Sequence, residues 1–423
     1  MKFFFPDSQD LVDPSFDFNR ETRSATRIRN RDDEYAHEVF STPAYDGMLV
    51  SKGVVDGFGA TAGKYTIAQR HRLLRIGVHE FFRTAGLSLP IIGDCGAFTY
   101  VRESVPPYTV DEVLEFYVEC RFDLGISVDH VILAYQPKFD ELVQIPNAVP
   151  LELRSRQEVT LQLASEFLTK HHAMKLNFEP MGVAQGWSPR SYAHSVSELQ
   201  KMGYDYIAIG GMVPLKTKEI VDCLTAIDEI RFPKTRLHLL GVTRTTHVSI
   251  FANFGVASFD STSPLRQAFK DDKDNYYTLD RTYTAIRVPQ VEGNANLQRK
   301  IVSGVVSQER ARRLEKACLE LMRKFENNEC SLEETLDALV EYDTFCEPGR
   351  DHREIYREVL SDRPWSKCPC DVCRRLGYHV ILFRGAERNR RRGFHNVWMF
   401  YRRLHRELGL DIDAALQVEA ASH

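Results

Sequence analysis

The chain has 423 residues, enough for one large domain with an appended subdomain or for two domains. Its hydrophobic fraction of 43% and charged fraction of 27% exclude a largely disordered or fibrous chain. No apolar run approaches the roughly 20 residues of a membrane span, and the apolar patch at the N-terminus is shorter than the core of a signal peptide. We therefore expect a cytoplasmic protein with no membrane partner.

The net charge of -4 is distributed unevenly along the chain. Residues 365–406 contain eleven Lys or Arg against two acids, a local charge of about +9 that leaves the rest of the chain strongly acidic. A basic block beside an acidic body is typical of a protein with a polyanion partner. A solvated basic face explains the charge equally well.

Residues 1–44 show no regular pattern and are predicted to be an N-terminal extension. They contain FFFP, many acids and a basic stretch from Arg20 to Arg31. Such an arm covers a neighbouring domain or contacts a ligand, and the sequence alone does not decide between these roles.

Residues 45–300 alternate short apolar runs with helical patterns, which favours a (β/α)8 TIM barrel over an open doubly wound sheet. Helices are expected at 66–84, 110–123, 153–174, 189–202 and 216–230. The helix at 189–202 has the clearest boundaries, with Ser188 as N-cap, Pro189 in its first position and Gly203 after its end. The eight expected strands are 45–52, 89–98, 128–135, 176–186, 204–211, 236–242, 256–261 and 283–291.

Residues 301–423 are predicted to form a helical, zinc-binding C-terminal region. Ser331 and Glu334 have the spacing of a capping box at the start of one of its helices. Nine cysteines are an odd number, and six of them are scattered without a disulfide framework, which suits a reducing compartment. The other three, Cys368, Cys370 and Cys373, lie within six residues.

This cysteine cluster predicts a structural zinc site, because three thiolates on one turn can converge on a tetrahedral ion. A fourth ligand is required to close the shell, and His379 and His395 are both near in sequence. We favour His395, since it opens the apolar stretch HNVWMFY, whose first helical turn would hold the ion. Three cysteines on a loop without a metal are the alternative.

The predicted strand ends carry the candidate catalytic groups, because functional side chains of a barrel lie at the C-terminal ends of its strands. Two carboxylates, Asp94 and Asp260, suit glycosyl chemistry, in which one attacks the anomeric carbon and the other moves the proton of the leaving group. A single Asp at a strand end is more often the N-cap of the next helix, and this is the alternative for each. Nearby polar, glycine and aromatic positions are Gln185, Gly210, Gly211, Gly241 and Phe98.

At these residues the chain resembles the tRNA-guanine transglycosylase family over roughly residues 45–400. GDCGAF is similar to the family's DSGGF, GVAQG to GIVQGG, AIGGM to AIGGL, HLLGV to YLMGVG, and FDSTSPLR to FDCVLPTR. CPCDVC with the later His395-Asn396 resembles the family's zinc motif. Six motifs in the family's order make the resemblance specific.

The resemblance implies a zinc-bearing barrel that exchanges guanine in a nucleic acid for a 7-deazaguanine by double displacement. It implies that Asp260 is the nucleophile and Asp94 the general acid/base. The implied reaction needs no ATP or redox cofactor. The further implied positions are Gln185, Gly210, Gly211 and Met212 for base recognition, Phe98 for stacking, Arg266 for seating the polynucleotide, and Cys368, Cys370, Cys373 and His395 for zinc.

Two departures stand out: no acid occurs near Tyr135-Gln136, where the family's second base-reading Asp is expected, and Phe269 replaces the family's next arginine. The N-terminal block resembles the DNA-modifying branch, which inserts preQ0 or a relative in bacterial and phage modification systems. A guanine in duplex DNA would then be flipped out, with an accessory DNA-opening protein as a candidate partner and basic residues around 20–31 and 384–406 as phosphate contacts. A homodimer stays open. The alternatives are a tRNA transglycosylase and an inactive nucleic-acid-binding subunit.

Overall fold

The protein is described by a computed structural model that covers residues 1–58, 61–142, 148–270 and 273–410. It separates into two compact units. We call residues 1–9, 45–262 and 404–410 the barrel unit, and residues 10–44 and 263–403 the C-terminal unit. No helix in the described ranges is both long and apolar enough to cross a bilayer.

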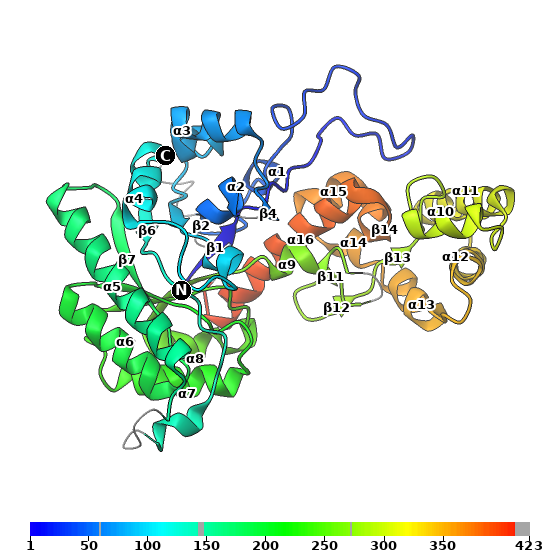
Figure 1. Cartoon of the computed structure of the whole chain (residues 1–423). Helices are drawn as coiled ribbons and strands as arrows, with labels where there is room; N and C mark the ends of the chain where they lie inside the picture. Colours follow the sequence, from blue (N-terminus) through cyan, green and yellow to red (C-terminus); the bar gives the residue numbers. More distant parts are fainter. Residues whose placement is uncertain (59–60, 143–147, 271–272, 411–423) are drawn as a thin grey trace. The chain divides into compact units, whose positions relative to one another are not determined.

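The barrel unit is a closed (β/α)8 barrel of eight parallel strands, as predicted, with the helices on its outside (Figure 1). Around the barrel the strands follow the order β1, β10, β9, β8, β7, β6, β5 and β2. Their bounds are β1 Lys2–Pro6, β2 Gly47–Ser51, β5 Ile91–Asp94, β6 Leu124–Ile126, β7 Glu179–Ala184, β8 Tyr206–Ile209, β9 Arg236–Leu239 and β10 Val256–Asp260.

The strand assignment differs from the sequence prediction at three places. The first barrel strand is β1, within the segment predicted to be irregular, where the buried side chains of Phe3, Phe4 and Phe5 pair their strand with β10 and β2. The predicted strand 283–291 lies outside the barrel and contains only the two-residue strands β12 (Thr282–Tyr283) and β13 (Ile286–Arg287). The three phenylalanines form an apolar run like the other barrel strands, but only the four-residue helix α1 (Ala36–Val39) lies between them and β2, so the usual strand-then-helix pattern is absent.

The predicted strand 128–135 is also shifted. The strand is β6, which ends at Ile126, and the following residues form a buried loop. This loop replaces ladder hydrogen bonds with side-chain ones, since the backbone N–H of Ile132 donates to Oε1 of Gln185 at 3.1 Å. In the sequence, an apolar run that is buried on both sides looks the same whether it forms a strand or a covered loop.

The predicted helices of the barrel unit are confirmed. Helix α6 (Pro189–Met202) begins after Ser188, whose hydroxyl accepts from the N–H of Ser191, and ends at Gly203, which has a φ of 111°. Such left-handed backbone is favourable for glycine. The other helices are α2 Lys52–Asp56, α3 Ile67–Phe81, α4 Val110–Cys120, α5 Leu151–Ala173, α7 Thr217–Asp228 and α8 Val248–Asn253. A short hairpin is formed by β3 (Gly57–Phe58) and β4 (Thr61–Ala62).

Apolar side chains fill the barrel interior. Strand residues point alternately inward and outward, so every second residue contributes to this core. Its members are Phe4, Leu49, Ile92, Leu124, Ile126, Met181, Val183, Tyr206 and Ala208.

The C-terminal unit is largely helical and contains the cysteine cluster. Helix α12 (Leu332–Cys346) begins as predicted, with the N–H of Glu334 donating to the hydroxyl of Ser331. The unit joins residues 10–44 to residues 263–403, so the expected boundary at 44 falls at an edge of the compact units, whereas the edge expected at 300 lies at 263. Residues 411–423 of the predicted region lie outside the described residues. Its other elements are α1 Ala36–Val39, α9 Ser263–Gln267, β11 Tyr276–Tyr277, α10 Ala295–Val302, α11 Gln308–Glu326, α13 Arg353–Asp362, α14 Pro364–Lys367, α15 Asp371–Leu376, β14 Leu382–Phe383 and α16 Gly385–Glu407.

Candidate active site and metal centre

Three carboxyl groups lie at the C-terminal ends of barrel strands. Asp94 is the last residue of β5, Asp260 is the last residue of β10, and Asp129 lies three residues after the end of β6. Asp129 and Asp260 are 2% and 7% exposed. Parallel strands place their carboxyl ends at one face of a barrel, so these acids share that face.

The protonation of Asp94 reflects this crowding. Burial, together with the like charges of Asp129 and Asp260, raises the pKa of Asp94 to about 7. Hydrogen bonds from Ser51 and from the backbone N–H of Gly96, 3.0 Å from Oδ2, oppose the shift. Asp94 therefore exchanges a proton near neutral pH, as a general acid/base requires.

Asp129 was missed by the sequence prediction, which found no acid near Tyr135-Gln136. The carboxyl of Asp129 accepts hydrogen bonds from the thiol of Cys95 at 3.2 Å and from Nε2 of Gln185 at 2.7 Å. Burial raises its pKa to about 6, although both hydrogen bonds act against the shift. Its position directly after an apolar strand was the available signal, and the error in the bounds of β6 concealed it.

Gln185 follows β7 and is 1% exposed. Both ends of its amide are engaged inside the protein, since Nε2 donates to Asp129 and Oε1 accepts from the N–H of Ile132. Gln185 thus holds the loop after β6 and the carboxyl of Asp129 in place. A direct contact from Gln185 to a base uses the second hydrogen of Nε2.

The two glycines after β8 provide room for this arrangement. A Cβ on Gly210 would lie 2.2 Å from Nε2 of Gln185, and one on Gly211 would lie 2.3 Å from the carbonyl oxygen of Ile132. Gly211 also has a φ of 73°. These glycines therefore allow the close approach of protein segments. Met212, the next residue, is fully buried.

Asp260 is held by two donors on one oxygen. Its Oδ1 accepts from the N–H of Gly241 at 2.9 Å and lies 3.2 Å from Nε2 of His238. His238 is fully buried on β9. This histidine was not among the predicted site residues, although it is the first residue of the HLLGV segment.

The remaining predicted ligand contacts have different settings. Phe98 lies in a 3₁₀ turn after β5 and is 52% exposed, so its ring is available for stacking. Arg266 is exposed on α9 in the C-terminal unit.

The predicted metal ligands converge in the C-terminal unit. Cys368, Cys370, Cys373 and His395 are buried, and their ligand atoms lie within 4.8 Å of one another. The three Sγ atoms lie 3.6, 3.4 and 3.4 Å from Nδ1 of His395. A tetrahedron with zinc–sulfur bonds of about 2.3 Å and zinc–nitrogen bonds of about 2.0 Å has edges close to these distances. The donor set fits zinc.

The surroundings of His395 support this fit. Its second nitrogen, Nε2, lies 2.7 Å from the carbonyl oxygen of Tyr277, which leaves Nδ1 free to bind the ion. The ring of Tyr276 stacks on the imidazole with centroids 4.1 Å apart. Asn396 accepts a hydrogen bond from the N–H of Tyr277, which fastens the same strand. His395 lies within α16, which begins at Gly385, so the prediction that it starts the helix was wrong.

His379, the alternative fourth ligand, is not part of the cluster. Its ring lies against Tyr378 and Phe18, with centroids 4.2 and 5.5 Å away. Burial and the neighbouring charge of Arg388 lower the pKa of His379 to about 3. It is therefore a neutral packing residue at physiological pH.

Half of the eight arginines predicted as phosphate contacts in residues 384–406 are buried and therefore unavailable for that role. Arg384, Arg388, Arg391 and Arg392 are between 0% and 5% exposed. Arg384 and Arg388 both pair with Glu21, at 2.6 and 2.5 Å. The other two bind backbone carbonyls of Asp13, Ala268, Val380 and Leu382. The sequence gives the charge of each residue, but it does not show which side of the helix is covered by other segments.

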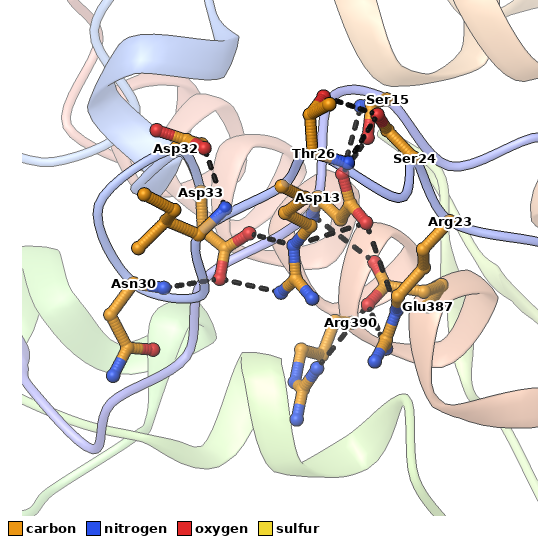
Figure 2. A network of polar contacts seen from close by, with 12 residues as sticks. Asp13, Ser15, Arg23, Ser24, Thr26, Asn30, Asp32, Asp33, Glu387 and Arg390 are labelled. Atoms are coloured by element: carbon orange, nitrogen blue, oxygen red, sulfur yellow. Dashed lines mark hydrogen bonds and ion pairs between the residues drawn. The ribbon is translucent and has the colours of Figure 1, made fainter.

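The partner of this basic helix is residues 10–44, which we call the arm. Figure 2 shows carboxylates of Asp13, Asp33 and Glu387 gathered around arginines. The guanidinium of Arg27 contacts Asp33 at 2.6 Å and Asp13 at 3.1 Å, and Arg23 contacts Glu387 at 2.8 Å. The arm is thus held by ion pairs, of which those of Arg27 are largely buried. Its exposed arginines are Arg20, Arg23, Arg29 and Arg31.

With this geometry established, the chain was compared with known proteins. It is 51% identical over 414 residues to a DNA-guanine transglycosylase of Salmonella montevideo, covering 97% of this chain and 98% of the relative. The chain belongs to the guanine transglycosylase superfamily, in its DNA branch. A tRNA-guanine(15) transglycosylase of Methanobrevibacter smithii is 27% identical over 214 residues, which is 48% of this chain and 29% of that protein. No family model matches.

Proposed function

We propose that this protein replaces a guanine in DNA by a 7-deazaguanine, such as preQ0, through a covalent intermediate on Asp260. The observation that carries the proposal is the group of three carboxyls at the barrel face, in which Asp94 has a pKa of about 7. The membership in the DNA branch supports DNA as the polymer.

In the first step, a carboxylate oxygen of Asp260 forms a bond to C1′ of the deoxyribose while the bond from C1′ to N9 of guanine breaks. Asp94 gives its proton to the departing base. In the second step, the ionised Asp94 takes the N9 proton of the incoming base, and that nitrogen displaces Asp260 from C1′. Two inversions retain the sugar configuration, and the proton balance closes without another reactant.

We infer that base recognition uses Asp129 as well as the predicted positions. The Asp129 carboxyl is buried, interacts with the charge of Asp94, and keeps free lone pairs beside its bonds from Cys95 and Gln185. A carboxylate there accepts hydrogen bonds from the donor edge of a guanine-like base. Phe98 supplies an exposed ring for stacking, and Gly210, Gly211 and Met212 form the adjoining wall.

The contact with DNA is assigned to the arm. Because four arginines between residues 384 and 392 are buried in internal contacts, the exposed arginines of the arm are the better candidates for phosphate binding. A fixed arm loses little conformational entropy when it binds. Combined replacement of Arg20, Arg29 and Arg31 by Ala should weaken DNA binding and reduce its salt dependence. Replacement of Arg310 and Arg313 on α11 by Ala is the control and should change DNA binding little. Equal loss in both variants contradicts this assignment.

The zinc is assigned a structural role. When bound, it would be held by three thiolates and one imidazole, which leaves no position for water or substrate. An accessory DNA-opening protein remains part of the proposal, since a guanine in duplex DNA is reached only after it leaves the stack. A homodimer is a separate part of the proposal.

The decisive experiment supplies labelled guanine or preQ0 with either DNA or tRNA and measures label in each polymer. We expect label in DNA only, and a denaturant-stable protein–DNA adduct. Asp260→Asn should abolish the adduct and lower exchange by at least about 10⁴-fold, as loss of an enzymatic nucleophile does. Label in tRNA alone favours the tRNA alternative, and no label with retained DNA binding favours an inactive subunit. Exchange at the normal rate by Asp260→Asn contradicts the nucleophile.

A further inference from the structure

A chain of hydrogen bonds runs from Asp260 into the barrel interior. Nδ1 of His238, whose Nε2 faces Asp260, lies 2.5 Å from Oγ of Ser258. The same Oγ lies 2.5 Å from the hydroxyl of Tyr206. His238 and Ser258 are fully buried, and Tyr206 is 4% exposed. These polar groups therefore satisfy one another in an otherwise apolar core.

The strand registers explain why these residues meet. Ser258 and Asp260 are two residues apart on β10, so both point into the barrel. His238 on β9 is the register partner of Ser258. Tyr206 enters from β8, and the ring of Phe4 packs edge-on against the imidazole with centroids 6.1 Å apart. The ring of His238 is thus held on several sides by the barrel wall.

The donor and acceptor of each hydrogen bond in this chain follow from the group at its Asp260 end. The N–H of Gly241 can only donate, so Oδ1 of Asp260 is an acceptor. A carboxylate there selects the His238 tautomer that carries hydrogen on Nε2. Nδ1 then accepts from Ser258, whose oxygen accepts from Tyr206. Among the described residues, none donates to Oδ2 of Asp260, which leaves this oxygen available.

We propose that His238, oriented by Ser258 and Tyr206, is a positioning residue that anchors Oδ1 of Asp260 and directs Oδ2 to C1′. This rests on the proposed function, in which Asp260 is the nucleophile. In the step itself, the Oδ2–C1′ bond forms and the C1′–N9 bond breaks, and no proton passes through His238. Ser258, His238 and Asp260 are the three residue types of a hydrolase triad. Here the serine is buried, so Asp260 takes the role of nucleophile and Ser258 orients the histidine.

The test compares four variants of the full chain. His238→Phe keeps a ring and removes the donor, whereas His238→Gln keeps an N–H near the position of Nε2. Ser258→Ala removes the group that sets the tautomer, and Tyr206→Phe removes the last hydroxyl. The rate of exchange, the KM for the free base and the amount of trapped adduct are measured for each, with folding checked by thermal melting.

We expect His238→Phe to lower kcat by about 10- to 100-fold with an unchanged KM, the effect of losing one hydrogen bond to a charged group. His238→Gln should recover most of this loss. Ser258→Ala should lower kcat about fivefold to tenfold and Tyr206→Phe less, because each acts through the next group. A merely structural histidine would not be rescued by Gln.

Two outcomes overturn the inference. One is a normal kcat in His238→Phe, whether or not its KM changes, and the other is no rescue by Gln in a folded protein. If His238→Phe does not fold, Ser258→Ala decides, and a normal kcat in that variant contradicts the proposal. Failure of the proposed function looks different, because the unaltered protein then exchanges no base on any DNA.

Discussion

Two groups of buried charges, one in each unit, differ in how the charges are balanced. At the barrel face, Asp94, Asp129 and Asp260 are like charges whose repulsion helps to raise the pKa of Asp94 to about 7. In the C-terminal unit, Arg384 and Arg388 surround Glu21 with opposite charge. Burial alone would raise the pKa of Glu21, but these arginines lower it to about 2.

The contrast separates chemistry from architecture. Buried like charges cost folding free energy, and a protein keeps them where a shifted pKa is needed. Buried opposite charges place a segment uniquely, although their net contribution to stability is small. We therefore propose that the barrel acids mark the reaction centre, whereas Arg384 and Arg388 mark a place where the arm is held.

The largest expected effect is on activity, in Asp94→Asn. Loss of the general acid/base should lower exchange by about 10²- to 10⁴-fold, while the fold is kept. In the unaltered protein, the step that needs protonated Asp94 should slow as the pH rises above about 7. The pH–rate profile checks this, and a profile unchanged in Asp94→Asn contradicts the role.

The same variant should also be more stable. A carboxyl whose pKa rises from 3.8 to about 7 on folding binds its proton more tightly in the folded state, so stability falls as the pH rises between these values. Asp94→Asn removes this loss and should gain on the order of 2 kcal/mol at pH 8, allowing for partial exposure. Denaturant titrations at pH 4 and pH 8 measure the gain. Asp111→Asn, at an exposed position, is the control and should show none.

The metal centre is next in size. Cys370→Ser should remove zinc and lower the melting temperature by about 5–10 °C, because zinc binding contributes directly to folding of its unit. Metal analysis of the purified protein and thermal melting give the result. Cys330→Ser, which changes the same atom outside the cluster, should keep the metal content. Stoichiometric zinc in Cys370→Ser disproves the ligand set.

The last prediction breaks the paired cluster. Glu21→Gln leaves Arg388 without its carboxylate partner and leaves Arg384 with Glu315 alone, and it should cost about 2–3 kcal/mol at pH 7. Because the pKa of Glu21 is lowered from 4.5 to about 2, its contribution is present above pH 4.5 and is lost as the pH falls towards 2. Unfolding measured at pH 3 and pH 7 tests the sign. Glu320→Gln, in an exposed pair with Lys324, is the control, with about 0.5 kcal/mol or less.

Local patterns in the sequence determined much of this protein. The helix from Pro189 to Met202, the barrel class and the cysteine ligands all depend on spacing and capping within a few residues, which sequence records directly. The same holds for Asp94 and Asp260 at the ends of their strands.

Only the tertiary structure decided the rest. Whether Lys2–Pro6 closes the barrel depends on strands more than 40 and 250 residues away. The covered face of α16, the place of Asp129 beside Asp94, and the contact of His238 with Asp260 also depend on distant partners. Charge and hydrophobicity are properties of a residue, whereas burial and pairing are properties of its neighbours, and folding alone chooses the neighbours.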